Sequence, residues 1–225
     1  MLVKDQMTPK PICGHPEMPV TDAQTLMQQN RIRHLPVVNS DGKLVGLITQ
    51  RSLMQAVPSD LSEFGPFVVN YVLAKLQAQN IMVRDVITID PSATIEEAAC
   101  IMADKKIGCL PVMQGEDLVG IISDSDLFSA MIELLGARRA GLRITVRQPD
   151  RAGEVARLTS ALAEQGGYLS VCVTYPTPDP GTWASVVKVT HIPEDVIVET
   201  VGKLPEIEIQ DVREVTYHPD PDEEK

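Results

Sequence analysis

The chain of 225 residues contains only four cysteines, and they form no recognisable motif. Cys13, Cys100, Cys109 and Cys172 are separated by 87, 9 and 63 positions, without a CxxC or a Cys/His pair at zinc-ligand spacing. The sequence therefore argues against a disulfide framework, and we expect no metal. It also lacks an uninterrupted apolar stretch of about 18 residues and the apolar region of a signal peptide. These absences predict a cytoplasmic protein that does not bind a membrane.

Positive charge is scarce. Twenty Lys and Arg residues stand against 31 Asp and Glu, which gives a net charge of −11, and such a chain repels a phosphate polymer. We expect no nucleic acid partner. P-loop, GxGxxG, GxSxG and HExxH signatures are also missing, and the histidines form no recognisable set. The sequence predicts a protein that is not an enzyme.

What the sequence does contain is an internal repeat. Arg31-Ile-Arg-His-Leu-Pro-Val-Val38 matches Lys106-Ile-Gly-Cys-Leu-Pro-Val-Met113 at an offset of 75 residues, and Val45-Gly-Leu-Ile48 matches Val119-Gly-Ile-Ile122 at an offset of 74. Each copy predicts a β-hairpin with a helix on either side, in the order strand, helix, strand, strand, helix. Thr94-x-x-Glu97 is a capping box that starts one of these helices. Since one copy buries too little apolar surface alone, the two should pack into one module.

The repeat resembles a known module. Met7-Thr-Pro9, His34-Leu-Pro-Val-Val38, Val83-Arg-Asp-Val86 and Gly120-Ile-Ile-Ser-Asp-Ser-Asp126 resemble tandem CBS domains, the pair called a Bateman module. On this basis we expect CBS repeat 1 at residues 1–57, a linker with a packing helix at 58–80, and CBS repeat 2 at 81–136.

A third unit follows at residues 142–217, where the hydrophobic pattern predicts β-α-β-β-α-β. With Asp150-Arg-Ala-Gly153 at the first strand-to-helix turn, this unit resembles an ACT domain, a small ferredoxin-like regulatory fold. The resemblance implies a small ligand at Asp150 and Gly153, and the alternative is that the glycine only satisfies the turn. Residues 218–225 form an acidic tail. The expected class is α+β, and the whole chain resembles acetoin-utilisation AcuB-type proteins.

The CBS resemblance implies a nucleotide cleft, in which a carboxylate holds the ribose hydroxyls and a hydroxyl holds phosphate. Asp126 and Ser123 match those positions in repeat 2, and the alternative is that Asp126 only caps its helix. Repeat 1 has Thr49 and Ser52 there, so we expect one good cleft and one that is weak, empty or differently used. The base slot implied by the resemblance consists of Ile87, Thr88, Ile107, Gly108 and the backbone of Leu110 and Pro111. The phosphate-binding candidates are Arg31, Arg33 and His34, and Cys109 is a further site residue at the place equivalent to His34. Whether the cations of repeat 1 and the carboxylate of repeat 2 meet in one cleft stays open.

These features together predict a non-catalytic regulatory sensor. The expected ligand is an adenine nucleotide (AMP, ADP or ATP) or S-adenosylmethionine, with no required cofactor. A second small metabolite is expected at the ACT-like unit, and the expected partners are a second copy of the chain, giving a homodimer, and a regulated enzyme. The alternative is a constitutive scaffold subunit of a metabolic enzyme whose clefts are vestigial.

Overall fold

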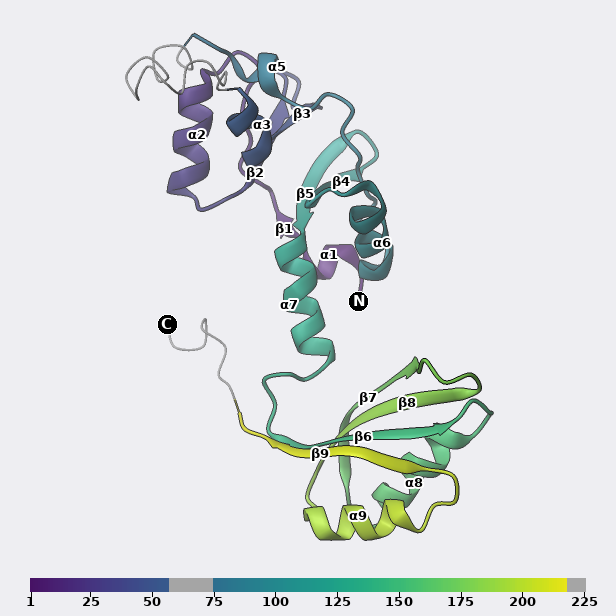
Figure 1. The fold of residues 1–225 in the computed structure, drawn as a ribbon. Coiled ribbons are helices and arrows are strands. Elements are labelled where there is room, and N and C mark those ends of the chain that lie inside the picture. Colours follow the sequence, from purple (N-terminus) through teal and green to yellow (C-terminus); the bar gives the residue numbers. More distant parts are fainter. Residues whose placement is uncertain (57–74, 218–225) are drawn as a thin grey trace. The chain divides into compact units, whose positions relative to one another are not determined.

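The computed structural model describes residues 1–56 and 75–217, and the chain divides into two compact units, Met1–Phe128 and the part from Ser129 onward (Figure 1). Most of the expected linker at 58–80 and the acidic tail at 218–225 lie outside the described residues. The first unit holds both copies of the repeat.

The first copy builds a hairpin between two helices. Helix α2 (Val20–Gln29) follows Pro19, and strands β2 (His34–Val38) and β3 (Leu44–Thr49) pair antiparallel before helix α3 (Gln50–Gln55). Leu35 lies opposite Ile48, and both side chains are fully buried. They pack against Ala23 and Met27 of α2, so the apolar face of the helix covers the hairpin.

The second copy repeats this arrangement with helix α6 (Ile95–Lys105), strands β4 (Cys109–Gln114) and β5 (Asp117–Ser123), and helix α7 (Asp124–Leu134). The predicted capping box is present. The Thr94 hydroxyl accepts from the Glu97 amide at 3.1 Å, and the Thr94 amide donates to the Glu97 carboxylate at 2.8 Å. Both predicted hairpins are therefore confirmed, with their flanking helices.

The segment that leads into each copy packs against the other copy. Helix α1 (Val3–Gln6) and strand β1 (Thr8–Pro9) begin repeat 1, yet β1 pairs with β5, and the Val3 amide donates to the Ala93 carbonyl at 2.8 Å. Reciprocally, Val83, just after helix α5 (Ala78–Ile81), exchanges two backbone hydrogen bonds of 2.9 Å with Leu47 of β3. This exchange ties the two repeats together through backbone hydrogen bonds.

Two glycines make room for the exchanged segments. A Cβ added at Gly120 would overlap the Met7 thioether, and one added at Gly46 would overlap the Met82 thioether. Met7 and Met82 hold matching positions in the two copies, so the same contact occurs twice. The Val-Gly pair of the repeat is therefore a packing requirement of the exchange.

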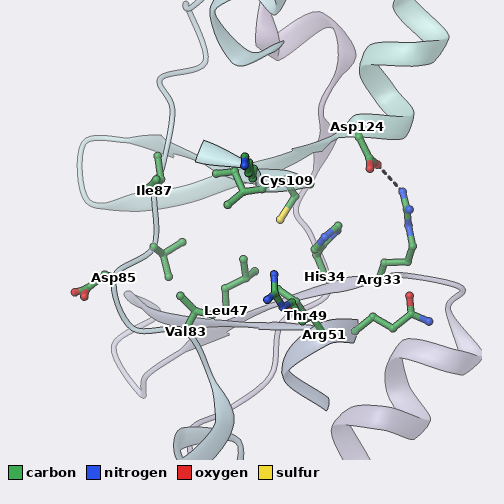
Figure 2. Close-up of a pocket in the computed structure, with 15 residues that line it drawn as sticks. Arg33, His34, Leu47, Thr49, Arg51, Val83, Asp85, Ile87, Cys109 and Asp124 are labelled. Atoms are coloured by element: carbon green, nitrogen blue, oxygen red, sulfur yellow. Dashed lines mark hydrogen bonds and ion pairs between the residues drawn. The ribbon is translucent and has the colours of Figure 1, made fainter. Parts of the chain in front are cut away.

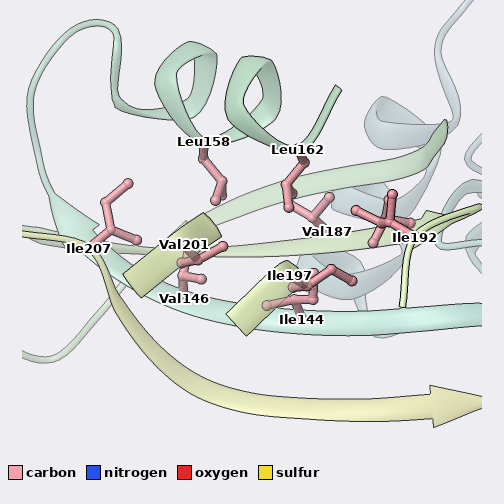
Figure 3. Packing of buried hydrophobic residues seen from close by; sticks show 10 residues of the cluster. Ile144, Val146, Leu158, Leu162, Val187, Ile192, Ile197, Val201 and Ile207 are labelled. Carbon is pink, nitrogen blue, oxygen red and sulfur yellow. The ribbon is translucent and has the colours of Figure 1, made fainter. Parts of the chain in front are cut away.

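The second unit has the predicted order β-α-β-β-α-β. Its elements are strand β6 (Gly141–Pro149), helix α8 (Glu154–Glu164), strands β7 (Tyr168–Pro176) and β8 (Thr182–Thr190), helix α9 (Glu194–Gly202) and strand β9 (Glu208–Val215). The sheet order is β7-β8-β6-β9, with every neighbouring pair antiparallel. Both helices lie on one face of this sheet (Figure 1). Figure 3 shows Leu158 and Leu162 of α8 packed over Val187, with Ile144 and Val146 of the neighbouring strand in the same core.

The other face of the sheet carries a buried lysine. Lys188 is 3% exposed, and its ammonium donates to the carbonyls of Gly136 and Arg139 at 2.6 and 2.8 Å. Gly136 has a φ of 54°, and a Cβ there would come within 2.8 Å of the Val171 side chain. The turn after α7 is therefore fixed to the sheet by one side chain and by close backbone packing.

Candidate nucleotide-binding clefts

Two of the clefts in the first unit lie where the exchanged segments meet the hairpins. The one that we call the Asp126 cleft has a volume of about 260 Å³. Three segments line it: the chain just after β1, the chain just before β2, and the junction of β5 with α7. Its lining residues are Thr8, Lys10, Pro11, Ile12, Arg31, Ile32, Arg33, His34, Ile121, Ser123, Ser125 and Asp126.

The second, which we call the Thr49 cleft, has a volume of about 330 Å³ (Figure 2). It is built from the chain after α5, the chain before β4, and the junction of β3 with α3. Its lining residues are Arg33, His34, Leu47, Thr49, Gln50, Arg51, Val83, Asp85, Val86, Ile87, Lys106, Ile107, Gly108, Cys109 and Asp124.

The two clefts are copies of each other. Ile12 and Lys10 of the first correspond to Ile87 and Asp85 of the second at the 75-residue offset, and Ser123 corresponds to Thr49 at the 74-residue offset. Ile12 is 39% exposed and Ile87 is 37% exposed, which is high for isoleucine. Each cleft therefore presents an uncovered apolar side chain at the same place.

The Asp126 carboxylate is held at the start of α7. Its Oδ2 accepts from the Ser123 amide at 2.7 Å and from the Ser123 hydroxyl at 2.8 Å. The helix-capping role considered from the sequence is thus present. Within residues 1–56 and 75–217 no hydrogen bond reaches Oδ1, so one oxygen of a fixed, half-buried carboxylate stays free beside the cleft.

Ser52 occupies the matching position in repeat 1 and uses its hydroxyl fully. The hydroxyl accepts from the Thr49 amide at 2.9 Å and donates to the Thr49 carbonyl at 2.9 Å, and the residue is only 9% exposed. Ser52 does not line the Thr49 cleft. Among the residues that the structure describes, this cleft accordingly has no acceptor at the place where the other has Asp126.

Arg33 and His34 line both clefts. The Arg33 guanidinium donates to the Asp124 carboxylate at 2.5 Å and to the Ser125 hydroxyl at 2.9 Å, and the ion pair is drawn in Figure 2. Burial lowers the pKa of His34, and the Arg33 charge lowers it further. Burial, with the nearby Asp124 carboxylate, raises the pKa of the Cys109 thiol to about 12. At neutral pH both side chains are therefore uncharged.

The structure divides the predicted site residues differently from our expectation of one cleft in repeat 2. Ile87, Ile107, Gly108 and Cys109 line the Thr49 cleft together with Thr49, away from Asp126 and Ser123. Thr88 and Pro111 line neither cleft. Thr88 is exposed elsewhere, and Pro111 is buried in β4 with its carbonyl accepting from the Ile89 amide at 3.1 Å.

The question of where the repeat 1 cations lie has a clear answer. Arg31, Arg33 and His34 line the same cleft as Ser123 and Asp126. The physical reason is the exchange, because it brings the chain after β1 to β5 and so closes a cleft around residues of both repeats. Sequence reasoning missed Lys10 and Ile12, although the 75-residue offset from the predicted site residue Ile87 pointed to Ile12.

The predicted site of the second unit lies at the turn before α8. Gly153 has a φ of 92°, and a Cβ there would meet nothing within 4 Å, so the glycine serves the left-handed turn. The Asp150 amide donates to the Gly181 carbonyl at 2.8 Å, which joins this turn to the β7–β8 loop.

The described part of the chain holds no group of three or more acidic, cysteine or histidine residues arranged to bind a metal ion. None of its helices combines the length and apolar character that crossing a bilayer needs.

Comparison with known proteins agrees with the architecture of the first unit. The CBS domain family model matches residues 3–59 and 78–133, which is half of the chain. The chain therefore belongs to the CBS domain family, and carries the domain as a tandem pair. The uncharacterized protein MJ1426 of Methanocaldococcus jannaschii is 32% identical over 157 residues, covering 59% of this chain and 92% of that protein. Other curated relatives are enzymes of which the match covers only 22–24%.

Solved structures that are similar to the CBS pair include the following two. A crystal structure from Vibrio cholerae named for acetoin utilization (AcuB) has a TM-score of 0.52 and 35% identity, covering 60% of this chain and 93% of that one. The CBS domain pair of protein MJ0100, solved with 5-methylthioadenosine and S-adenosyl-L-methionine, has a TM-score of 0.50 and 28% identity, covering 58% and 95%. Both matches cover little more than the CBS pair.

Proposed function

We propose that this chain is a non-catalytic regulatory sensor that binds an adenosine-containing nucleotide in the Asp126 cleft. The observation that carries the proposal is the free Oδ1 of a carboxylate whose other oxygen is fixed by Ser123. A fixed carboxylate beside a cleft suits the two neighbouring hydroxyls of a ribose, because both can donate to it.

The rest of the cleft supplies the other two parts of such a ligand site. Ile12 offers an uncovered apolar surface for the base. Lys10 and Arg31 bring two cationic groups against the carboxylate of Asp126, in a chain whose net charge is −11, and the third cation of the cleft, Arg33, is paired with Asp124. The MJ0100 pair, which was solved with two adenosine compounds, supports an adenosine ligand here as well.

We infer that the second unit is an ACT-like domain with a ferredoxin-like fold, and that it acts in regulation. The β-α-β-β-α-β order, the sheet order β7-β8-β6-β9 and the left-handed turn at Gly153 support this assignment. A ligand that prefers one arrangement of the CBS pair shifts a pre-existing equilibrium. Helix α7 begins at Asp124, which lines the Thr49 cleft, and runs without a break to Leu134, so it is the covalent path to the second unit. A homodimer and a regulated enzyme remain the proposed partners.

Thermal unfolding with a ligand panel tests the function. AMP, ADP, ATP, S-adenosylmethionine and free amino acids are each added to the full chain at several concentrations. A true ligand at 100 times its dissociation constant stabilises the protein by about 2.7 kcal/mol, which raises the melting temperature by about 5 to 10 °C. If no adenosine compound shifts the melt, the scaffold alternative is favoured and the proposal fails.

The substitution Asp126→Ser tests the site. It installs the residue that repeat 1 carries at the matching position, where a serine hydroxyl supports the helix start, so the cap is kept and only the carboxylate is lost. Losing charge-assisted hydrogen bonds to the ribose should cost about 1.5–3 kcal/mol, or about 10- to 150-fold in affinity measured by calorimetry. Ser52→Ala is the matched control and should leave nucleotide affinity within about twofold.

A further inference from the structure

The two edges of the sheet in the second unit differ in charge. Strands β7 and β9 form these edges (Figure 1), and within the described residues β7 pairs only with β8. Four of the eight residues of β9 are charged, namely Glu208, Asp211, Arg213 and Glu214. None of the nine residues of β7 is charged, and the uncharged run extends over residues 166–178. Charged side chains commonly protect a free sheet edge from further pairing, so β9 is protected in this way and β7 is not.

Strand β7 also leaves apolar and backbone groups uncovered. The backbone of an edge strand presents a row of N–H and C=O groups that its own sheet does not use. Near the two ends of β7, Tyr168 is 62% exposed and Tyr175 is 46% exposed, and Cys172 between them is also exposed. Tyrosine is enriched where proteins contact each other, because it combines a large apolar surface with a hydroxyl group. The edge therefore offers both the hydrogen bonds and the apolar surface that a further strand needs.

The sequence of β7 indicates which strand fits this edge. Residues 170–174 read Ser-Val-Cys-Val-Thr, which is nearly the same in both directions about Cys172. Cys172 is also the middle residue of Tyr168–Pro176. If two copies of β7 pair antiparallel about a two-fold axis at Cys172, Val171 of each lies opposite Val173 of the other, on the same face of the sheet. Such pairs of β-branched side chains suit the pleated surface of a sheet, so β7 is complementary to itself.

Charge and symmetry also favour a second copy of the chain. Each copy carries a net charge of −11, so two copies repel each other where charged surfaces meet, and an uncharged edge avoids this repulsion. Pairing of β7 with itself about a two-fold axis closes the assembly, because each copy then uses its uncharged edge. The charged β9 edges remain outside and oppose further growth of the sheet. The contact therefore yields a dimer and not a fibre.

We propose that β7 is a dimer interface, in which the β7 strands of two copies pair antiparallel with Cys172 at the two-fold axis. The pairing joins the two four-stranded sheets into one continuous sheet. The register shift between β7 and β8 falls between Leu169 and Val171, to one side of this axis. The proposal rests on the proposed function only in that a homodimer is expected there, and it names the strand and the register through which the two copies meet.

The cysteines of the chain provide a direct test of this register. Residues directly opposite each other on antiparallel strands have Cα atoms about 4.5–5.5 Å apart, a separation that a disulfide can span. Mild oxidation of the full chain with copper phenanthroline should therefore link two copies through Cys172, each thiol losing one proton and one electron to the copper oxidant. Cys172→Ser should remove this cross-link. Cys100→Ser, at the exposed cysteine of α6, is the matched control and should leave it unchanged.

Charge substitutions at the axis test the same geometry without oxidation. In Cys172→Glu two carboxylates meet at the axis, so the dissociation constant of the dimer, measured by analytical ultracentrifugation, should rise at least about tenfold. Gln210→Glu adds the same charge at an exposed position of β9 and should leave the dissociation constant within about twofold. Cys172→Lys should weaken the dimer as Cys172→Glu does. An equimolar mixture of these two variants should recover the dimer, because unlike charges then meet at the axis.

Three results would overturn the proposal. They are a chain that stays monomeric at every protein concentration tested, a cross-link through Cys172 that forms no faster than one through Cys100, and a mixture of the two charged variants that associates no more tightly than either alone. The proposed nucleotide function is read separately, because β7 lines neither cleft. AMP should raise the melting temperature of Cys172→Glu as it does that of the unsubstituted protein. Absence of this rise in both proteins would defeat the proposed function alone.

Discussion

The exchange of lead-in segments predicts which isoleucine belongs to the cleft of Asp126. The structure places Ile12 there, and it places Ile87 in the Thr49 cleft. Replacing Ile12 with serine should therefore weaken diol-dependent nucleotide binding, and Ile87→Ser should not. The two residues are matched in position, type and exposure, so each serves as the control for the other.

The expected size follows from the surface that a ligand covers. Fully burying an isoleucine side chain is worth about 1.5–3 kcal/mol, and the ligand can cover at most the 39% of Ile12 that is exposed. The contribution is about 0.6–1.2 kcal/mol, or about three- to eightfold in affinity. Ile12→Ser should cost that much, with no loss of unfolding free energy beyond that of Ile87→Ser.

The assay is calorimetry with AMP and 2′,3′-dideoxyadenosine 5′-monophosphate, which differ only in the ribose hydroxyls, so the difference in affinity between them reports the diol-dependent binding. Ile87→Ser should leave this difference within about twofold of that of the unsubstituted protein. A larger loss from Ile87→Ser than from Ile12→Ser would refute the assignment of the clefts, since it would mean that the first segment of repeat 2 forms the base slot next to Asp126.

Three further predictions concern packing and protonation. Gly120→Ala should lower the unfolding free energy by about 1–3 kcal/mol, because the methionine thioether of the exchanged segment fills the space that the added methyl group needs. Gly202→Ala adds a methyl group that meets nothing within 4 Å, so it should raise the unfolding free energy by about 0.4–1 kcal/mol. Chemical denaturation measures both changes. Lys188→Met leaves two carbonyls of the α7 turn without their donor and should cost about 1–3 kcal/mol by the same measurement, and an unchanged stability would show that the clamp is dispensable. Burial lowers the pKa of His34, so as the pH falls below about 6.5 the unfolded chain binds a proton more readily than the folded chain does, and the unfolding free energy should decrease. His34→Gln should flatten this part of the curve of unfolding free energy against pH. An unaltered curve would contradict the lowered pKa.

Local signals explain which parts of the fold can be predicted from the sequence. The hairpins follow from two short apolar runs around a turn, and helix α6 follows from the Thr94 capping box, because neighbouring residues satisfy both. Likewise, the alternation in 142–146 and the helical spacing after Glu154 are enough to place β6 and α8. The local spacing of Asp126 and Ser123 predicts only a helix cap, and it is the resemblance of the repeat to CBS domains that marks Asp126 as a ligand-binding candidate.

Contacts between distant segments explain what the sequence does not reveal. The 75-residue offset makes positions 12 and 87 equivalent, but it does not state which copy each one packs against, and only the pairing of Thr8 with Ile121 decides that. The alternation of side chains along β8 also predicts that Lys188 lies on an exposed face of the strand. Its burial depends on the turn at Gly136, which is 52 residues away and has no periodic signal.

The duplication also limits how strongly the two clefts can influence each other. Arg33 donates to Asp124, which lines the Thr49 cleft, and to Ser125, which lines the Asp126 cleft, so an anion in either cleft competes for one guanidinium. The side chains of the Arg33–Asp124 pair are 49% and 41% exposed, and such a pair is worth at most about 1 kcal/mol. Coupling through Arg33 alone is therefore no more than about fivefold in affinity. A larger coupling between the clefts would require the two repeats to move relative to each other, and the backbone hydrogen bonds of the exchanged segments, such as those between Val83 and Leu47, are the contacts that resist this movement.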